Sequence, residues 1–322
     1  MTTELLVLSH DDVRRLLPMD ECIELMEAVL SDLARGRVWL PLRFTVQPPG
    51  EQSLMGLMPA HRSEPQRAYG LKAICIFPEN PARGLDAHQG GVLLCDGETG
   101  QLRALLDASA VTAVRTAAVS AVATRSLARE DAKEFAILGA GVQARSHLEA
   151  LPHVRAFEKV RIWSRTPEHA QAVAAEARLP VEVAESAEAA VTGADVVVTA
   201  TSSREPVVER AWLAPGAHVN AVGSSIPTAR ELDDATMAEA ALFCDARESL
   251  VNEAGDYLLA GLGPDSIRAE LGEVLTGSAE GRRDDEELTV FKSLGLGVED
   301  LAAAEHVYER ARAEGVGSAV PF

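Results

Sequence analysis

Residues 135–144 read FAILGAGVQA, and this stretch decides the fold. The first four residues are apolar, as in a buried strand, and residues 145–151 (RSHLEAL) read as a helix. Between them stands the pattern G-x-G-x-x-A, in which Gly139 permits a tight turn and Ala144 lets helix and strand pack closely. The stretch predicts the strand, turn and helix of a Rossmann-type fold.

The same turn predicts a phosphate-binding site. Gly141 would let backbone amides approach a pyrophosphate, and the N-terminus of the following helix carries partial positive charge. A tight turn without a ligand is the alternative, but the strand before it, the helix after it and a second β-α unit weigh against that alternative. We therefore expect this turn to hold a dinucleotide through Gly139, Gly141, Val142, Gln143 and Ala144.

The next predicted strand, residues 160–163, ends in Ser164, Arg165 and Thr166. An enzyme that uses NAD places a carboxylate near this point to hold the ribose 2′-hydroxyl, and this chain has none there. Serine, arginine and threonine would instead hydrogen-bond and charge-pair with a 2′-phosphate, which favours NADPH over NADH. The alternative is that Arg165 faces solvent and that selectivity is loose.

Strands and helices keep alternating beyond this point. Further strands are expected at residues 181–183, 196–200, 217–222 and 241–244, with helices between the early ones. This alternation predicts the α/β class, with a doubly wound parallel sheet and helices on both faces. The Ala-rich residues 109–128 read as a helix leading into this domain, which we place at residues 116–297. The charge run RRDDEE at residues 282–287 reads as a solvated loop.

Residues 1–115 predict a smaller mixed α/β domain. Ser9, with Asp12 three residues later, can cap a first helix that Pro18 ends, and a second helix spans about residues 20–35 before Gly36. Short apolar runs split by Pro, Gly and Asn then predict strands over residues 38–106. A strand-like stretch at 289–293 precedes a last helix at 298–314, and we expect residues 298–322 to pack back on this domain.

Composition limits the partners. The chain has 322 residues with 30 Lys plus Arg against 49 Asp plus Glu, a formal net charge of −19 that would repel nucleic acid and anionic lipid. Any anionic ligand must therefore meet a local cationic pocket. Four cysteines without a C-x-x-C pair indicate neither a zinc site nor a disulfide scaffold, and no apolar window is long enough to span a bilayer. We expect a cytoplasmic protein without a metal.

Three basic residues stand in apolar or helical surroundings and are candidates to bind a substrate. Arg43 and Lys72 lie in β-like segments, and Arg115 lies in the Ala-rich helix. Lys72 is the most informative, because an ammonium group in an apolar strand is costly unless it pairs with a carboxylate or faces a pocket. For each residue alone, an edge-strand or snorkelling side chain is the alternative.

The sequence resembles the ornithine cyclodeaminase/mu-crystallin family over nearly its whole length. The matching stretches are Gly56-Leu-Met-Pro59, Gly70-Leu-Lys72, His88-Gln-Gly90, Asp96-Gly-Glu-Thr-Gly100, Val114-Arg-Thr-Ala-Ala118, Gly139-Ala-Gly-Val-Gln143, Asn220-Ala-Val-Gly223, Arg230-Glu-Leu-Asp233, Phe291-Lys-Ser-Leu-Gly295 and Val298-Glu-Asp300. The resemblance implies a Rossmann domain joined to a domain that forms a homodimer, with the active site between them.

The resemblance also implies roles for individual residues. Arg43, Lys72 and Arg115 would clamp the carboxylate of the substrate, with Ser225 nearby, and His88 and Gln89 would lie near the nicotinamide unless His88 is a structural histidine. Glu253 resembles a pocket acid that would face the nitrogen of an iminium, the alternative being that it caps or solvates a helix. The cofactor would also contact Thr116, Ala200, Thr201, Ser202, Gly223 and Ser293.

Two positions depart from the cyclodeaminase pattern. Family members that cyclise ornithine carry a glutamate where this chain has Gly56 and an aspartate where it has Ser225. Neither glycine nor serine can accept a proton near neutral pH, and both match the mu-crystallin side of the family, whose enzymes reduce cyclic ketimines. We therefore expect NADPH to reduce the C=N bond of a 2-imino acid such as a five- or six-membered cyclic ketimine carboxylate, with Lys72 or water supplying a proton.

Three alternatives stay open at this point. The first is an amino-acid dehydrogenase of the archaeal alanine dehydrogenase type, which forms an open-chain imine from a 2-oxo acid and ammonia. The second is ornithine cyclodeamination. The third is not an enzyme but an NADPH-dependent small-ligand-binding protein.

Overall fold

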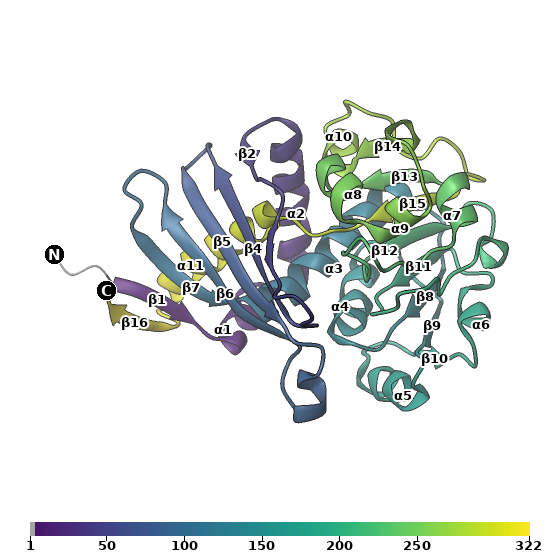
Figure 1. The fold of residues 1–322 in the computed structure, drawn as a ribbon, viewed down its shortest axis with the longest axis horizontal. Helices are drawn as coiled ribbons and strands as arrows, with labels where there is room; N and C mark the ends of the chain where they lie inside the picture. The colour runs from purple at the N-terminus through teal and green to yellow at the C-terminus, as the bar shows by residue number, and fades with distance from the viewer. Residues whose placement is uncertain (1–3) are drawn as a thin grey trace. The chain divides into compact units, whose positions relative to one another are not determined.

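The computed structural model describes residues 4–322 and divides into two compact units. Unit 1 combines residues 1–115 with residues 296–322, and unit 2 is residues 116–295. Each unit is built on its own eight-stranded sheet (Figure 1). No helix within residues 4–322 is long and apolar enough to cross a membrane.

Unit 1 is a mostly antiparallel sheet packed against helices. Strands β4 to β7 form a meander, β1 runs parallel to β7, and β16 pairs with β1 in the antiparallel sense. The Ser9–Asp12 capping box at the start of α1 is present, as predicted. The elements are β1 (Glu4–Leu8), α1 (His10–Leu16), α2 (Met19–Ala34), β2 (Val38–Trp39), β3 (Phe44–Val46), β4 (Leu54–Arg62), β5 (Ala68–Ile76), the 3-10 helix η1 (Asn80–Arg83), β6 (His88–Asp96), β7 (Leu102–Asp107), the first part of α3 (Ala108–Leu127), α11 (Gly297–Glu314) and β16 (Ser318–Pro321).

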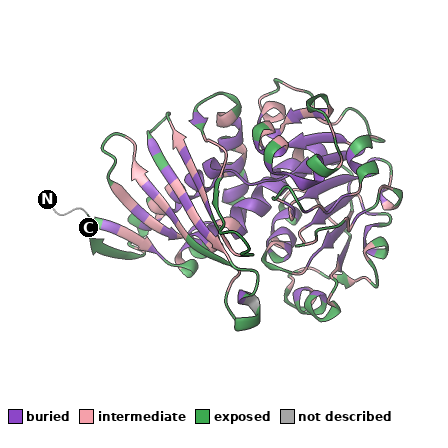
Figure 2. Cartoon of the chain, viewed as in Figure 1, coloured by how far each residue is buried: buried purple, intermediate pink, exposed green. Residues whose placement is uncertain are grey.

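One face of the unit 1 sheet packs against helix α11, and the opposite face carries exposed apolar side chains. Helix α11 packs on β4, β5 and β6, and it lies so close that a Cβ atom on Gly70 would be 3.0 Å from the Cβ of Leu301. Along β4 and β5, buried residues alternate with more exposed ones, as Figure 2 shows. Strand pairing places one set of large, exposed apolar side chains on the face opposite α11, and we call this set the open sheet face: Trp39, Phe44, Val46, Met55 and Tyr69.

Unit 2 is the predicted Rossmann-type fold. Its strands are all parallel and run in the order β10-β9-β8-β11-β12-β15-β13-β14. The central strands are buried along their whole length, as expected for a parallel sheet covered on both faces. From β8 the chain first moves outward to β9 and β10 and then returns to β11 on the other side, so the topological switch point lies between β8 and β11.

The elements of unit 2 follow α3 along the chain. They are β8 (Glu134–Leu138), α4 (Val142–Ala150), η2 (Leu151–His153), β9 (Lys159–Trp163), α5 (Pro167–Glu176), β10 (Glu182–Val183), α6 (Ala187–Val191), β11 (Val196–Thr199), η3 (Arg210–Trp212), β12 (His218–Ala221), α7 (Asp234–Glu239), β13 (Ala241–Cys244), α8 (Arg247–Glu253), α9 (Gly255–Leu259), η4 (Pro264–Ser266), β14 (Ile267–Glu270), α10 (Leu271–Leu275) and β15 (Thr289–Lys292). Each predicted strand of this unit is present, with ends that shift by at most a residue or two.

The charge run at residues 282–287 is not simply a solvated loop. Residues 283–286 are exposed, but Arg282 is partly buried and donates hydrogen bonds to backbone oxygens. Its Nε donates to the oxygen of Leu127 at 2.6 Å, and its Nη2 donates to the oxygen of Gly216 at 3.0 Å. The prediction was wrong for Arg282, because the guanidinium satisfies carbonyl groups at the end of α3 and before β12, which only the folded chain brings near it.

Candidate active site

The glycine turn has the geometry that a pyrophosphate needs. Gly139 has φ +118°, and a Cβ atom there would lie 2.3 Å from the oxygen of Ala200, so only glycine fits at the switch point. Gly141 is the N-cap of α4 and is exposed, and a Cβ atom there would meet nothing within 4 Å. The first turn of α4 therefore opens onto free space at its positive end, with the exposed Val142 beside it and Ala144 buried underneath. These residues fit a dinucleotide phosphate.

The segment after β9 lies at the same edge of the sheet, because β9 and β8 are parallel neighbours. Thr166 is the N-cap of α5, and its N–H donates to Ser164 Oγ at 3.3 Å. Arg165 is exposed, whereas Ser164 and Thr166 are half-buried. An exposed arginine between two hydroxyl groups can reach a phosphate, and it is equally compatible with the solvent-facing alternative.

The ends of β11, β12 and β15 carry the other predicted cofactor residues. Ala200 and Thr201 are half-buried, Ser202 is exposed, and Ser293, which directly follows β15, is buried. The buried Glu231 was not among the predicted site residues, yet its carboxylate accepts hydrogen bonds from Thr201 and from Gly223. Sequence reasoning missed it because Arg230-Glu-Leu-Asp233 reads as a polar segment whose burial depends on distant strands.

Two of the predicted cations of unit 1, Lys72 and Arg115, contact two carboxylates. Lys72, which is 3% exposed, has its Nζ 2.8 Å from Asp300 Oδ2. Arg115 reaches the same carboxylate, with its Nε 3.0 Å from Asp300 Oδ1, and its Nη1 lies 2.8 Å from Glu299 Oε2. Glu299 and Asp300 are themselves buried. We call Arg43, Lys72, Arg115, Glu299 and Asp300 the charge cluster.

Close backbone packing makes the charge cluster possible. Glu299 and Asp300 stand in the first turn of α11, and the helix begins at Gly297, where a Cβ atom would lie 2.9 Å from the oxygen of Pro59 in β4. A larger residue would push the helix away from the sheet. The stretch Val298-Glu-Asp300 is one of those that carry the family resemblance, but the sequence predicts no site residue within it. The available clue was Lys72, because an ammonium group in an apolar strand predicts a carboxylate partner or a pocket.

Electrostatics within the charge cluster perturb Lys72. Burial, together with the positive charges of Arg115 and Arg43, lowers its pKa to about 8, although Asp300 opposes the shift. The effect of Arg43 places this residue in the same electrostatic neighbourhood as Lys72. A lysine with a pKa near 8 can hold or release a proton near neutral pH.

The remaining predicted residues occupy varied environments. His88 is the first residue of β6 and is exposed, and its backbone N–H donates to Asp86 Oδ1 at 3.0 Å. Glu253 is the last residue of α8 and is 9% exposed. Thr116 is buried in α3, and Ser225 is half-buried in the loop after β12.

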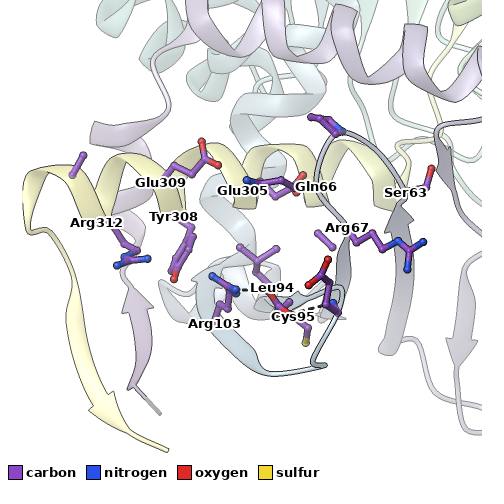
Figure 3. Close-up of a pocket in the computed structure, with 15 residues that line it drawn as sticks. Ser63, Gln66, Arg67, Leu94, Cys95, Arg103, Glu305, Tyr308, Glu309 and Arg312 are labelled. Atoms are coloured by element: carbon purple, nitrogen blue, oxygen red, sulfur yellow. Dashed lines mark hydrogen bonds and ion pairs between the residues drawn. The ribbon is translucent and has the colours of Figure 1, made fainter. Parts of the chain in front are cut away.

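A separate cavity of about 1040 Å³ lies in unit 1 beside the second half of α11 (Figure 3). Among the residues that the structure describes, its lining includes none of the predicted site residues. Its described lining carries four carboxylates and three arginines, and one of those arginines, Arg103, contacts Asp96. Burial raises the pKa of Glu305 in its wall to about 7. This cavity is less suited to an anionic substrate than the charge cluster.

The fold and the glycine turn together define a dinucleotide-binding protein of the Rossmann class. The chain belongs to the ornithine cyclodeaminase/mu-crystallin family, whose model matches residues 3–315. The resemblance that the sequence motifs carried is thereby confirmed.

Three members of known function or structure are similar to this chain over most of its length. The chain is 43% identical over 287 residues to ketimine reductase mu-crystallin of Mus musculus, covering 88% of this chain and 90% of that protein. It resembles the structure of Thermococcus litoralis Δ1-pyrroline-2-carboxylate reductase in complex with NADH and L-proline, with a TM-score of 0.95 and 36% identity, covering 98% of this chain and 100% of that one. An archaeal alanine dehydrogenase dimer with bound NAD has a TM-score of 0.94 and 33% identity, covering 99% of this chain and 100% of that chain.

Proposed function

We propose that this protein is an NADPH-dependent reductase of 2-imino acids, with cyclic ketimine carboxylates as the substrate class. The observation that carries the proposal is the buried charge cluster, in which a lysine of lowered pKa stands among arginines. Two relatives support it by their names, since one is a ketimine reductase and the other reduces pyrroline-2-carboxylate. Gly56 and Ser225 argue against ornithine cyclodeamination, because neither offers a carboxylate.

The charge cluster would bind the carboxylate of the substrate. Its five side chains carry three positive and two negative charges, so they have one net positive charge in total while Lys72 is protonated. One net positive charge matches a single substrate carboxylate. Glu299 and Asp300 hold Arg115 and Lys72 in fixed positions, which reduces the entropy lost when the anion binds.

The cofactor would be held by unit 2. The glycine turn fits its pyrophosphate, and Ser164 to Thr166, Ala200 to Ser202, Gly223, Ser293 and Thr116 are the proposed contacts. When bound, the reduced dinucleotide supplies a hydride to the carbon of the C=N bond. The nitrogen then needs one proton to give the amine. Lys72 can provide that proton when the imine binds in its neutral form, because its lowered pKa makes the ammonium group a better acid.

Purified protein tests this function directly. The decrease in NADPH and NADH absorbance is measured with five- and six-membered cyclic ketimine carboxylates, and with pyruvate plus ammonia; ornithine is tested with the oxidised cofactors. We expect the cyclic ketimines to give the highest kcat/KM. Faster turnover of pyruvate with ammonia would favour the alanine dehydrogenase type. Tight cofactor binding without any turnover would favour a ligand-binding protein.

The preference for NADPH rests on Arg165. Replacing Arg165→Asp removes a positive charge and adds a negative one where a 2′-phosphate would lie, so kcat/KM for NADPH should fall at least tenfold relative to NADH. Arg178→Asp makes the same charge change at another exposed arginine of unit 2 and should leave the ratio unchanged. If the ratio of kcat/KM for NADPH to that for NADH is the same in Arg165→Asp as in the unsubstituted protein, Arg165 does not bind a 2′-phosphate.

We also propose that the open sheet face binds a second copy of the chain. Five large apolar residues lie exposed on one face of a sheet, an arrangement that monomeric proteins rarely present to water. A two-fold axis can pair such a face with itself. The related archaeal alanine dehydrogenase is a dimer, which supports a second copy as the partner. A cytoplasmic location stays a prediction.

A further inference from the structure

Glu231 of unit 2 has a carboxylate that accepts four hydrogen bonds from residues near the ends of β11 and β12. It is 0% exposed and follows the loop after β12. Its Oε1 accepts from the Thr201 N–H at 2.6 Å and from Thr201 Oγ1 at 2.7 Å. Its Oε2 accepts from Thr199 Oγ1 at 2.8 Å and from the Gly223 N–H at 2.7 Å. One side chain therefore joins the end of β11 to the end of β12.

The identity of the four partners requires a carboxylate. All of them are donors, and only an ionised carboxylate has acceptor sites for four without carrying a hydrogen of its own. Glutamine at this position would turn an NH₂ group toward two of those donors. Burial and the negative charge of Asp256 raise the pKa of Glu231, while the charge of Lys292 and the hydrogen bonds of Thr201 oppose that rise.

The surrounding backbone is built to hold this carboxylate in place. Asp256 Oδ1 accepts from the N–H groups of Glu231 and Leu232 at 2.6 and 2.9 Å, and its Oδ2 lies 3.0 Å from Lys292 Nζ. Asp256 and Lys292 are both 0% exposed. A Cβ atom on Gly223 would lie 2.5 Å from Glu231 Oε1, so a larger residue there would displace the carboxylate.

The location of this network indicates which half of the cofactor it serves. A doubly wound sheet binds a dinucleotide across its switch point, one half on each side. The segment after β9, where a 2′-phosphate would bind, lies on one side of β8, whereas β11 and β12 lie on the other. The loops that Glu231 joins are therefore on the side of the nicotinamide half.

We propose that Glu231 is a positioning residue, whose carboxylate fixes the loops after β11 and β12 so that they bind the nicotinamide half of the cofactor. This inference rests on the proposed function, because it requires that unit 2 bind such a cofactor. Glu231 acts through Thr201 and Gly223 rather than by touching the reacting atoms.

Binding measurements with Glu231→Gln test the proposal without relying on turnover. We expect the Kd for NADPH, measured by the fluorescence of the bound reduced nicotinamide, to rise at least tenfold, with a weaker fluorescence enhancement at saturation. The Kd for 2′-phospho-ADP-ribose, which lacks the nicotinamide, should change less than twofold by calorimetry. If NADH proves to be the preferred cofactor, NADH and ADP-ribose replace this pair.

Two further variants keep the test decisive. Thr199→Val removes one of the four donors without changing the shape of the side chain, so it should raise the NADPH Kd about threefold, and it decides the question if Glu231→Gln does not fold. Glu134→Gln is the control. Glu134 is the first residue of β8, so it lies at the edge of the sheet opposite the strand ends that Glu231 joins, and it forms an ion pair with Arg161 at 2.6 Å. This substitution should leave both Kd values unchanged.

The outcomes separate this inference from the proposed function. An unchanged NADPH Kd in Glu231→Gln, or equal weakening of NADPH and of the adenosine fragment, would overturn the positioning role. Unsubstituted protein that binds neither NADPH nor NADH would overturn the proposed function and this inference with it.

Discussion

Lys72 illustrates how a single residue can reveal a site. Its sequence context, a cation in an apolar strand, predicts a carboxylate partner or a pocket, and Asp300 Oδ2 lies 2.8 Å from Lys72 Nζ. The carboxylates Asp300, Glu299 and Glu231 gave no comparable indication, because an acidic residue in a polar stretch is usually exposed. Their burial results from packing between segments far apart in the chain, as in the 185-residue separation between Arg115 and Asp300. Sequence therefore predicted the cations of the charge cluster better than its anions.

The pKa of Lys72 leads to a prediction about pH. The protonated form donates the proton and predominates below a pKa of about 8, so kcat/KM for imine reduction should be constant below that value and fall as pH rises through it. The pH profiles of kcat/KM are measured with two cyclic ketimines whose imine groups differ in pKa. This comparison distinguishes a titration of the enzyme from a titration of the substrate. We expect kcat/KM to fall near pH 8 with both substrates. If the pH of this fall instead follows the pKa of the imine, the titrating group is the substrate and not Lys72.

Replacing Lys72 tests its role more directly. Lys72→Met removes one positive charge from the charge cluster and leaves Asp300 paired with Arg115 only, so we expect kcat/KM to fall at least a hundredfold, with some loss of stability. Arg14→Met on α1 removes a positive charge outside the charge cluster and should change kcat/KM less than twofold. Thermal unfolding of both variants shows how much of the effect comes from folding. If Lys72→Met and Arg14→Met both change kcat/KM by the same small factor, Lys72 has a structural role only.

At the scale of elements, the glycine turn was predictable because its constraints are local. Strand, turn and helix are adjacent in sequence, and the φ of +118° at Gly139 follows from the motif itself. The short strands β1, β14 and β16 were not predicted. Residues Ser318–Pro321 of β16 are all exposed and therefore lack the alternation of buried and polar residues that identifies a strand. Pairing with β1 makes this segment a strand, and pairing is a tertiary property.

The two glycines of the turn should respond differently to alanine. Gly141→Ala adds a Cβ atom that meets no protein atom within 4 Å, so the free energy of unfolding should change by less than about 0.5 kcal/mol. The same Cβ atom would occupy space next to the cofactor phosphates, and the NADPH Kd should rise at least tenfold. Chemical denaturation and fluorescence titration measure the two effects.

Gly139→Ala is the matched comparison for that prediction. Its Cβ atom would overlap the oxygen of Ala200, and alanine disfavours φ +118°, so we expect a loss of about 2 kcal/mol or more in the free energy of unfolding together with weaker cofactor binding. Equal destabilisation by both substitutions would contradict the assignment of Gly141 to ligand contact.

At the scale of the whole molecule, the open sheet face leads to a prediction about assembly. Met55→Glu places a charge among apolar residues of that face, so two-fold pairing would bury two carboxylates and should be weakened strongly. Analytical ultracentrifugation should show a dimer for the unsubstituted protein and a monomer for Met55→Glu at low micromolar concentration. Leu259→Glu, at an exposed leucine of α9, should remain dimeric. Unsubstituted protein that sediments as a monomer would refute the proposed interface.

The assembly of unit 1 from residues 1–115 and 296–322 affects how the chain folds during synthesis. Lys72 and Arg115 leave the ribosome long before Glu299 and Asp300, so the two cations have no carboxylate partners until all of unit 2 has been made. Unit 2 is contiguous and can fold first, as domains generally do during translation. The charge cluster is then completed last, when α11 docks on the sheet. A chain interrupted just after residue 295 would therefore contain all of unit 2 but would lack the two carboxylates of the charge cluster.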